Sequence, residues 1–230
     1  EDIRNIFNAH NGGGIITMLT ASQVIWSLTG TIVENVPGTN VVTTKLEHPC
    51  AYDSARFFAE KTGKEFRAAD TNPETGGVDA EAIAKLIDEN TCLLSVIYAS
   101  NISGAILDLP AIVREARKIK PDLHIIVDSV QHAPHGIIDV DAMQLDGVSF
   151  APYKFFGVRG SGIGYASERV TRLPHPRLRG NSENTWKLGS PAPGHYAAVS
   201  EIFNYVSWLG SQACAIDNRR DLFVAGMERI

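Results

Sequence analysis

Residues 124–131, with the sequence HIIVDSVQ, and residues 147–157, with the sequence GVSFAPYKFFG, decide the fold of this chain. Each stretch opens with a short apolar run that is typical of a buried strand and then places polar side chains at its end. The first delivers Asp128 and Gln131, and the second delivers Lys154. Taken singly, Asp128 is explained by a turn cap and Lys154 by the surface, but buried charges need partners. We therefore treat the two residues together as candidates for function.

Over the whole chain, strand-like and helix-like segments alternate. The apolar spacing and the glycine and proline positions predict helices at residues 22–34, 52–62, 79–88, 110–119, 194–209 and 219–230, with Ser22 as the N-cap of the first. Runs of β-branched and apolar residues predict strands at residues 40–45, 65–68, 92–98, 124–127, 147–150 and 162–166. Residues 12–14 are expected to form a turn, and residues 172–186 a long irregular loop.

This order predicts an α/β fold, a three-layer αβα sandwich built around a mostly parallel sheet. Ligands of such sheets bind outside the carboxyl ends of the strands, so Asp128 and Lys154 are expected on the same rim. We expect one large domain at residues 1–209. Residues 210–230 are expected to begin the helix that leads to a small C-terminal domain, which is largely absent. The N-terminal end is also expected to be truncated, because the chain begins with Glu1.

The composition excludes several classes of protein. The chain has 230 residues, 44% of them hydrophobic, which is enough for a full hydrophobic core. Its net charge is −5 and its basic runs are short, so nucleic acid is not an expected partner. No apolar run approaches the ~20 residues of a membrane span. The three cysteines have neither metal-site nor disulfide spacing, which favours a reducing cytoplasm and predicts no metal.

The chemistry of the two candidate residues points to a cofactor. An amine in an apolar pocket can lose its proton and attack an aldehyde, and Phe155 and Phe156 are expected to supply apolar surroundings for Lys154. A carboxylate at Asp128 could hold a protonated ring nitrogen, while the Gln131 amide could donate to a phenolic oxygen. These groups predict pyridoxal 5′-phosphate (PLP) bound to Lys154 as a Schiff base.

Five more residues are candidates, each with an ordinary structural explanation beside the functional one. His48 follows a strand and could stack on the cofactor ring or serve in proton transfer, or it could be a plain loop histidine. Ala21 and Ser22 open a helix, which is a ready anion site or a common cap. Asn101 could reach a ligand or only form a turn. Ser190 could be another phosphate hydroxyl or a helix-entry residue.

These segments, in this order, resemble the class V aminotransferase family of fold-type I PLP enzymes, nearest to the cysteine desulfurases and desulfurase-like proteins. The resemblance runs from about Thr20 to Leu209, most of the chain. The matching motifs are LEHP at residues 46–49, SNISG at residues 100–104, VDSVQ at residues 127–131, SFAPYK at residues 149–154, ASQ at residues 21–23 and LGSP at residues 188–191.

The resemblance implies a role for each matched residue. Lys154 would carry the Schiff base, Asp128 would contact the pyridinium nitrogen, and Gln131 would contact the phenolic oxygen. His48 would stack on the ring, with Asn101 beside the cofactor or substrate. The remaining matches imply phosphate contacts from Ala21, Ser22, Tyr153 and Ser190, the last reaching the site of a neighbouring subunit. An amino-acid substrate and a homodimer with shared sites are therefore expected.

The chain also departs from the desulfurase pattern. Ala151 and Tyr153 stand where that pattern has phosphate-binding Ser and His, and none of the three cysteines matches the place of the desulfurase nucleophile. The resemblance leaves the reaction open between an aminotransferase or a cysteine desulfurase-like enzyme, a kynureninase-like lyase or hydrolase, and an epimerase. Outside this enzyme class, the sequence is also compatible with a degenerate interaction module of the same fold. A nucleotide-binding α/β protein is less favoured, because the chain lacks a phosphate-loop motif.

Overall fold

A computed structural model describes residues 1–182, 184–190 and 192–230 of the chain. Within these residues one sheet runs through the molecule, with the strand order β1-β7-β6-β5-β4-β2-β3. The strands are β1 (Gly14–Met18), β2 (Asn40–Thr44), β3 (Glu65–Ala69), β4 (Thr91–Ile97), β5 (His124–Asp128), β6 (Gly147–Phe150) and β7 (Gly162–Ala166). Strands β3, β2, β4, β5 and β6 are parallel, and β7 pairs antiparallel with both β6 and β1. The predicted mostly parallel sheet is confirmed.

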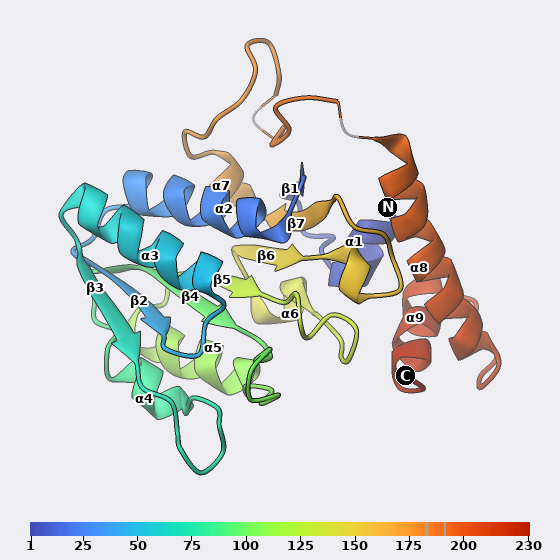
Figure 1. Cartoon of the computed structure of the whole chain (residues 1–230), viewed down its shortest axis with the longest axis horizontal. Coiled ribbons are helices and arrows are strands. Elements are labelled where there is room, and N and C mark those ends of the chain that lie inside the picture. Colours follow the sequence, from blue (N-terminus) through green and yellow to red (C-terminus); the bar gives the residue numbers. More distant parts are fainter. Residues whose placement is uncertain (183, 191) are drawn as a thin grey trace.

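Helices cover both faces of this sheet (Figure 1). They are α1 (Asp2–Phe7), α2 (Ala21–Asn35), α3 (Pro49–Thr62), α4 (Ala80–Ala84), α5 (Leu109–Ile119), α6 (Val140–Met143), α7 (Glu168–Thr171), α8 (Pro193–Ser211) and α9 (Arg219–Met227), with a short 3-10 helix η1 (Pro152–Lys154). In Figure 1, α2 and α3 lie above the sheet, and α4 and α5 lie below it. The α/β three-layer arrangement is therefore confirmed.

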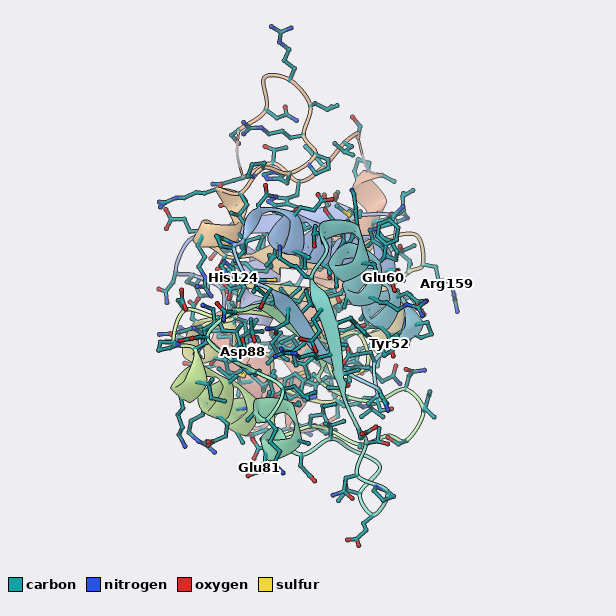
Figure 2. All side chains as sticks on the ribbon, turned by 90° about the vertical axis from the view of Figure 1, so that its left-hand side faces the viewer. Tyr52, Glu60, Glu81, Asp88, His124 and Arg159 are labelled. Atoms are coloured by element: carbon teal, nitrogen blue, oxygen red, sulfur yellow. The ribbon has the colours of Figure 1, made fainter. Side chains whose placement is uncertain are left out.

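The central strands are buried on both faces because their side chains alternate between two apolar layers. Leu93 of β4 and Ile126 of β5 pack with α2 and α3, whereas Leu94 and Ile125 pack with α5 on the other side. Figure 2 looks onto the β3 edge of the sheet, with Tyr52 and Glu60 of α3 on one side of the strand and Glu81 and Asp88 on the other. Because the central strands are buried, the polar residues at their carboxyl ends, such as Asp128, have fixed positions at one edge of the sheet.

Several boundaries differ from the sequence prediction. The N-cap of α2 is Thr20, not Ser22, because the Thr20 side chain accepts a hydrogen bond from the backbone N–H of Gln23. The helix predicted at residues 79–88 ends at Ala84, and the chain continues in short i→i+3 turns. The turn predicted at residues 12–14 is wrong for Gly14, which starts β1 and pairs with Ala166. The strand signal at β1 is weak because three glycines precede a run of only four residues.

The C-terminal part of the chain lies at the side of the sheet. Helices α8 and α9 pack against each other and against α1 (Figure 1). Between α7 and α8 the described residues form no helix or strand, as expected for residues 172–186, of which Glu183 lies outside the described residues. Within the described chain, no helix combines the length and the apolar character that a membrane crossing requires.

Candidate active site

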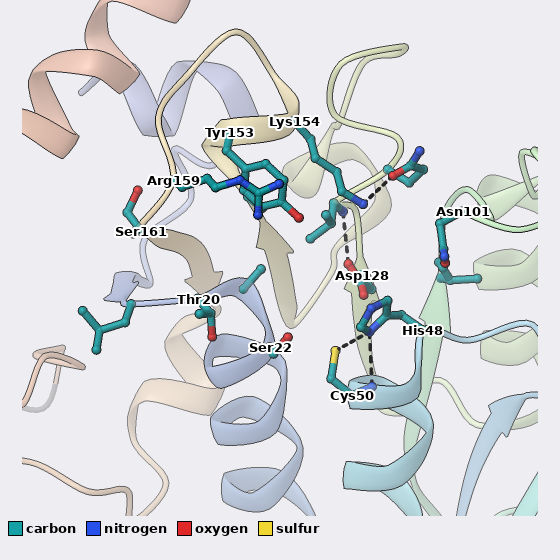
Figure 3. A pocket seen from close by; sticks show the side chains of 17 residues that line it. Thr20, Ser22, His48, Cys50, Asn101, Asp128, Tyr153, Lys154, Arg159 and Ser161 are labelled. Carbon is teal, nitrogen blue, oxygen red and sulfur yellow. Dashed lines mark hydrogen bonds between the residues drawn. The ribbon is translucent and has the colours of Figure 1, made fainter.

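A cavity of about 280 Å³ opens at the carboxyl ends of the central strands (Figure 3). Eight of the nine residues predicted to form the site line it: Ala21, Ser22, His48, Asn101, Asp128, Gln131, Tyr153 and Lys154. These residues come from separate parts of the chain, and the sheet topology brings them together. We call His48, Asn101 and Asp128, which follow or end parallel strands, the strand-end wall. We call Tyr153, Arg159 and Ser161, which lie between β6 and β7, the loop wall.

Asp128 ends β5 and is buried, with 4% of its surface exposed. Its Oδ1 atom accepts hydrogen bonds from the backbone N–H of Val130, at 3.0 Å, and from the hydroxyl of Ser149, at 3.2 Å. Burial raises the pKa of the Asp128 carboxyl, and the Val130 amide, His48, Ser149 and Lys154 oppose this rise. No hydrogen bond to Oδ2 comes from the described residues, so this oxygen is available to a donor inside the cavity.

Lys154 is the last residue of η1, which starts at Pro152 and turns the chain sharply out of β6. Its Nζ atom donates a hydrogen bond to Oε1 of Gln131, at 2.7 Å. The amine therefore reaches the turn that follows β5, as the sequence predicted for two neighbouring strand ends. The expected role of Phe155 and Phe156 is wrong: Phe155 is buried against Phe150 and Phe223, and Phe156 contacts Tyr205.

The apolar surface near Lys154 comes instead from other segments. Ile97, Val130 and Ala151 line the same cavity. Ile97 ends β4, Val130 follows β5 and Ala151 follows β6, so all three lie at strand ends. Phe155 is the first residue after η1, so the direction of its side chain depends on that helical turn, which the sequence run alone does not reveal.

His48 caps α3 and is held in one orientation. Its Nδ1 atom accepts a hydrogen bond from the backbone N–H of Cys50, at 3.2 Å, so in the neutral ring the hydrogen sits on Nε2. Behind it, Oε1 of the buried Glu47 accepts from the hydroxyl of Thr44, at 2.7 Å, and from the amide of Ile97, at 2.9 Å. Burial raises the pKa of Glu47 to about 8. Glu47 thus ties the ends of β2 and β4 together beneath His48.

Asn101 lies in the turn after β4, and hydrogen bonds to the side chain of Ser100 hold the backbone of this turn. The buried Ser100 hydroxyl oxygen accepts hydrogen bonds from the amides of Ile102, at 3.1 Å, and Ser103, at 3.2 Å. Gly104 completes the turn with a φ of 77°, a conformation that favours glycine. This geometry leaves Asn101 exposed at the mouth of the cavity, across from Lys154 (Figure 3).

A sequence model of the aminotransferase class-V family matches residues 1–212. The chain belongs to the class V aminotransferase family. This match covers the strand-end wall, the loop wall and every strand of the sheet. It confirms the family that the motifs indicated.

Among class V relatives, the chain is similar to cysteine desulfurases. It is 28% identical over 194 residues to those of Salmonella choleraesuis (strain SC-B67) and Salmonella typhimurium, a match that covers 77% of this chain and 47% of each relative. The chain thus spans about half the length of these relatives. A cysteine desulfurase of Escherichia coli, CsdA, has a similar fold (TM-score 0.74, 20% identity, 92% of this chain and 60% of that one). So does one from Thermococcus onnurineus (TM-score 0.73, 18% identity, 92% and 59%).

The class V motifs did not reveal every residue of the cavity. Thr20, Cys50, Arg159 and Ser161 also line it. Cys50 lies 3.0 Å from Nδ1 of His48, but burial raises the pKa of its thiol to about 11, so it carries little thiolate at neutral pH. The one sequence signal for Cys50 as a cavity residue is its position two residues after His48, in the first turn of α3. Arg159 and Ser161 lie in a glycine-rich loop without a recognisable motif.

Ser190 is the one predicted site residue that the structure places elsewhere. It lines a second, larger cavity of about 770 Å³ beside the first, together with Trp26, Trp186 and Leu188. The two cavities share Leu19, Ser22 and Cys50. Pro191, the last residue of the LGSP motif, lies outside the described residues. The prediction that Ser190 serves a neighbouring subunit stays a prediction.

Proposed function

We propose that this chain is the cofactor-binding part of a PLP-dependent enzyme that acts on an amino acid, an aminotransferase or a cysteine desulfurase-like transferase. The observation that carries the proposal is the meeting of Lys154, Asp128 and His48 in one cavity from three different strand ends. In this proposal residues 1–209 form the PLP-binding domain, and residues 210–230 begin the connection to a further domain.

The residues of the cavity suit this cofactor. Its volume, about 280 Å³, is close to the lower end of the range for small-molecule sites, about 300–1,000 Å³. Asp128 is a buried carboxylate with an oxygen free for a cationic N–H donor, which a protonated pyridine ring provides. His48 presents an oriented imidazole, which suits stacking on such a ring.

When bound, PLP supplies an electron-accepting ring that weakens the bonds at the substrate α-carbon. Nζ of Lys154 would hold the cofactor aldehyde covalently until the substrate amine displaces it. The freed Lys154 amine would then take the proton from the α-carbon and return it, as a general base and acid. Asp128 would keep the proton on the ring nitrogen, and Gln131 would donate its amide to the phenolic oxygen.

Two features support a homodimer. Exposed apolar side chains gather around the second cavity, with Leu19 67% and Leu188 58% exposed, and such patches often mark protein contacts. The same cavity opens beside the first, so a partner seated there would reach the cofactor site. We infer a homodimer with shared sites, with Ser190 reaching the partner's phosphate group. The three free cysteines favour a reducing cytoplasm.

Covalent attachment tests the proposal directly. We expect the purified full-length protein to absorb at the violet edge of the visible range after PLP is added. Borohydride reduction should then fix the cofactor on Lys154, and peptide mass mapping should locate it. Lys154→Ala should lose the label, whereas Lys118→Ala, on the exposed face of α5, should keep it.

A wild-type protein without a chromophore, or a label that persists in Lys154→Ala, would contradict the proposal. With the label in place, the reaction follows from two assays on the same preparation. Sulfide release from cysteine would identify desulfurase chemistry, and amino transfer that depends on a keto acid would identify an aminotransferase.

A further inference from the structure

The loop wall holds two residues, Arg159 and Ser161, to which the motifs assign no role. The guanidinium carbon of Arg159 lies 4.4 Å from the centroid of the Tyr153 ring. Such a cation over an aromatic face is held in place without being neutralised. Figure 3 shows both side chains above the first turn of α2, on the opposite side of the cavity from Asn101. Arg159 thus brings a fixed positive charge to the cavity.

No described residue neutralises this charge. Arg159 forms no ion pair and donates no hydrogen bond within the described part of the chain, and it lines the cavity from the margin of the molecule (Figure 2). The only acidic side chain among the lining residues is Asp128, which belongs to the strand-end wall. An unpaired guanidinium beside a cavity favours an anionic ligand.

Ser161 adds a second, independent sign of a ligand. It is 7% exposed, and its buried hydroxyl has no hydrogen-bond partner among the described residues. The next residue, Gly162, approaches α2 so closely that a Cβ atom would lie 2.1 Å from the carbonyl carbon of Thr20 and 2.3 Å from the amide nitrogen of Ala21. Ser161 is therefore fixed beside the N-terminus of a 15-residue helix.

The helix N-terminus completes the set of donors. The Thr20 side chain caps the amide of Gln23, and the amides of Ala21 and Ser22 have no acceptor within the helix. Amides at such a position, together with the helix dipole, bind anions. Backbone amides, an orphaned hydroxyl and an unpaired guanidinium thus converge on one end of the cavity.

We propose that Arg159 and Ser161 bind the phosphate group of the cofactor, with Arg159 supplying the main positive charge. A phosphate monoester carries about −1.5 to −2 charges at pH 7, which a planar guanidinium matches with two parallel hydrogen bonds. Ala151 offers no hydroxyl to this group, and Arg159 takes over the binding that a hydroxyl there would provide. This inference rests on the proposed function and adds two positioning residues to it.

The test compares PLP with pyridoxal, which lacks the phosphate group. Dissociation constants are measured by absorbance titration for the wild-type protein, Arg159→Gln, Arg159→Lys and Ser161→Ala. Arg114→Gln, on the exposed surface of α5, is the matched control. Loss of a charge-assisted contact predicts that Arg159→Gln weakens PLP binding about ten- to a hundredfold. The affinity for pyridoxal should change by less than about twofold, and Arg159→Lys should lie between.

Two results would overturn the inference. Equal weakening for PLP and pyridoxal would mean that Arg159 only shapes the cavity. Unchanged PLP affinity together with weaker amino-acid binding would assign Arg159 to the substrate carboxylate. Circular dichroism checks the fold of each variant, and Ser161→Ala gives an independent second measurement.

The failure of the proposed function would show separately. If wild-type protein binds neither PLP nor pyridoxal, the enzyme proposal fails, but the anion site can still be measured. Calorimetric titration with inorganic phosphate should then show binding to wild type and Arg114→Gln, and loss of binding in Arg159→Gln. Equal phosphate binding in wild type and Arg159→Gln would overturn the anion site itself.

Discussion

The two walls of the cavity are built on different principles. The strand-end wall stands on buried parallel strands, and its carboxylate is 4% exposed. The loop wall stands on an irregular segment between β6 and β7, where Tyr153 is 37% exposed and Arg159 is exposed too. In our proposal the first wall positions the groups that act on the cofactor ring, and the second gathers cationic and hydroxyl groups for its phosphate. Asp128 is thus held by a buried strand, whereas Tyr153 and Arg159 are held by a loop that solvent reaches.

The contact between the end of the loop wall and the start of α2 should be the most sensitive position. Gly162→Ala would force a Cβ atom into the backbone at Thr20 and Ala21, where no flexible side chain can move aside. We expect a loss of about 3 kcal/mol or more in the free energy of unfolding, at the upper end of overpacking effects. Urea denaturation at pH 7 measures this loss.

Gly194→Ala is the matched control, because a Cβ atom there meets nothing within 4 Å in the first turn of α8. Its free energy of unfolding should stay within about 0.5 kcal/mol of wild type or rise slightly. If both variants unfold alike, β7 does not press on α2 as described, and Ser161 of the loop wall is not held against the helix.

Burial beneath the strand-end wall should give the protein a pH dependence. The folded protein keeps the Glu47 proton up to about pH 8, whereas an unfolded glutamate releases it near 4.5. Between these values the folded state binds more protons, so its stability contribution from Glu47 falls as the pH rises. Glu47→Gln cannot ionise at this position. Its free energy of unfolding relative to wild type should therefore rise by roughly 1–3 kcal/mol as the pH increases from 5 to 8.

Urea denaturation of the cofactor-free protein at pH 5, 6.5 and 8 checks this expectation. Glu60→Gln, on the exposed face of α3, controls for the general loss of one carboxylate. A difference between Glu47→Gln and wild type that stays constant over this range would mean that Glu47 is ionised in the folded state. The strand-end wall would then tolerate a buried charge.

The smallest effect should come from Ala151, which directly follows β6 and comes just before the loop wall. Ala151 is 3% exposed and lines the cavity, so Ala151→Ser would add one hydroxyl near the proposed phosphate site. A net hydrogen bond of about 0.5–1.5 kcal/mol predicts PLP binding that is tighter by up to about tenfold, without a change for pyridoxal. The same substitution should recover part of the loss in Arg159→Gln. Weaker PLP binding in Ala151→Ser would show that this position faces no phosphate.

The sequence was informative where local pattern and burial agree. Asp128, His48 and Asn101 each follow an apolar run, and parallel topology then requires their side chains to meet at one edge. The seven-stranded sheet among the described residues was predictable for the same reason, except for β1. That strand pairs only with β7, so its place depends on a distant partner and not on its own residues.

The loop wall was harder to predict because its geometry comes from contacts between distant segments. Ser161 gains its place from the approach of Gly162 to Thr20, which no local spacing encodes. Arg159 looks like any exposed arginine until the Tyr153 ring beneath it is known. The prediction for Phe155 was wrong because its place next to Lys154 in the sequence suggested a cavity residue. Its ring packs on Phe223 of α9 instead.

The pairing of β1 with β7 has a consequence for how the protein is made. Gly14 is synthesised long before its partner Ala166. At about 5–20 residues per second, β1 and the start of α2 wait on the order of ten seconds for β7. During that time the nascent chain exposes an unpaired strand, which other chains could capture. The proposed anion site is therefore complete only after β7 has paired with β1 and packed against α2.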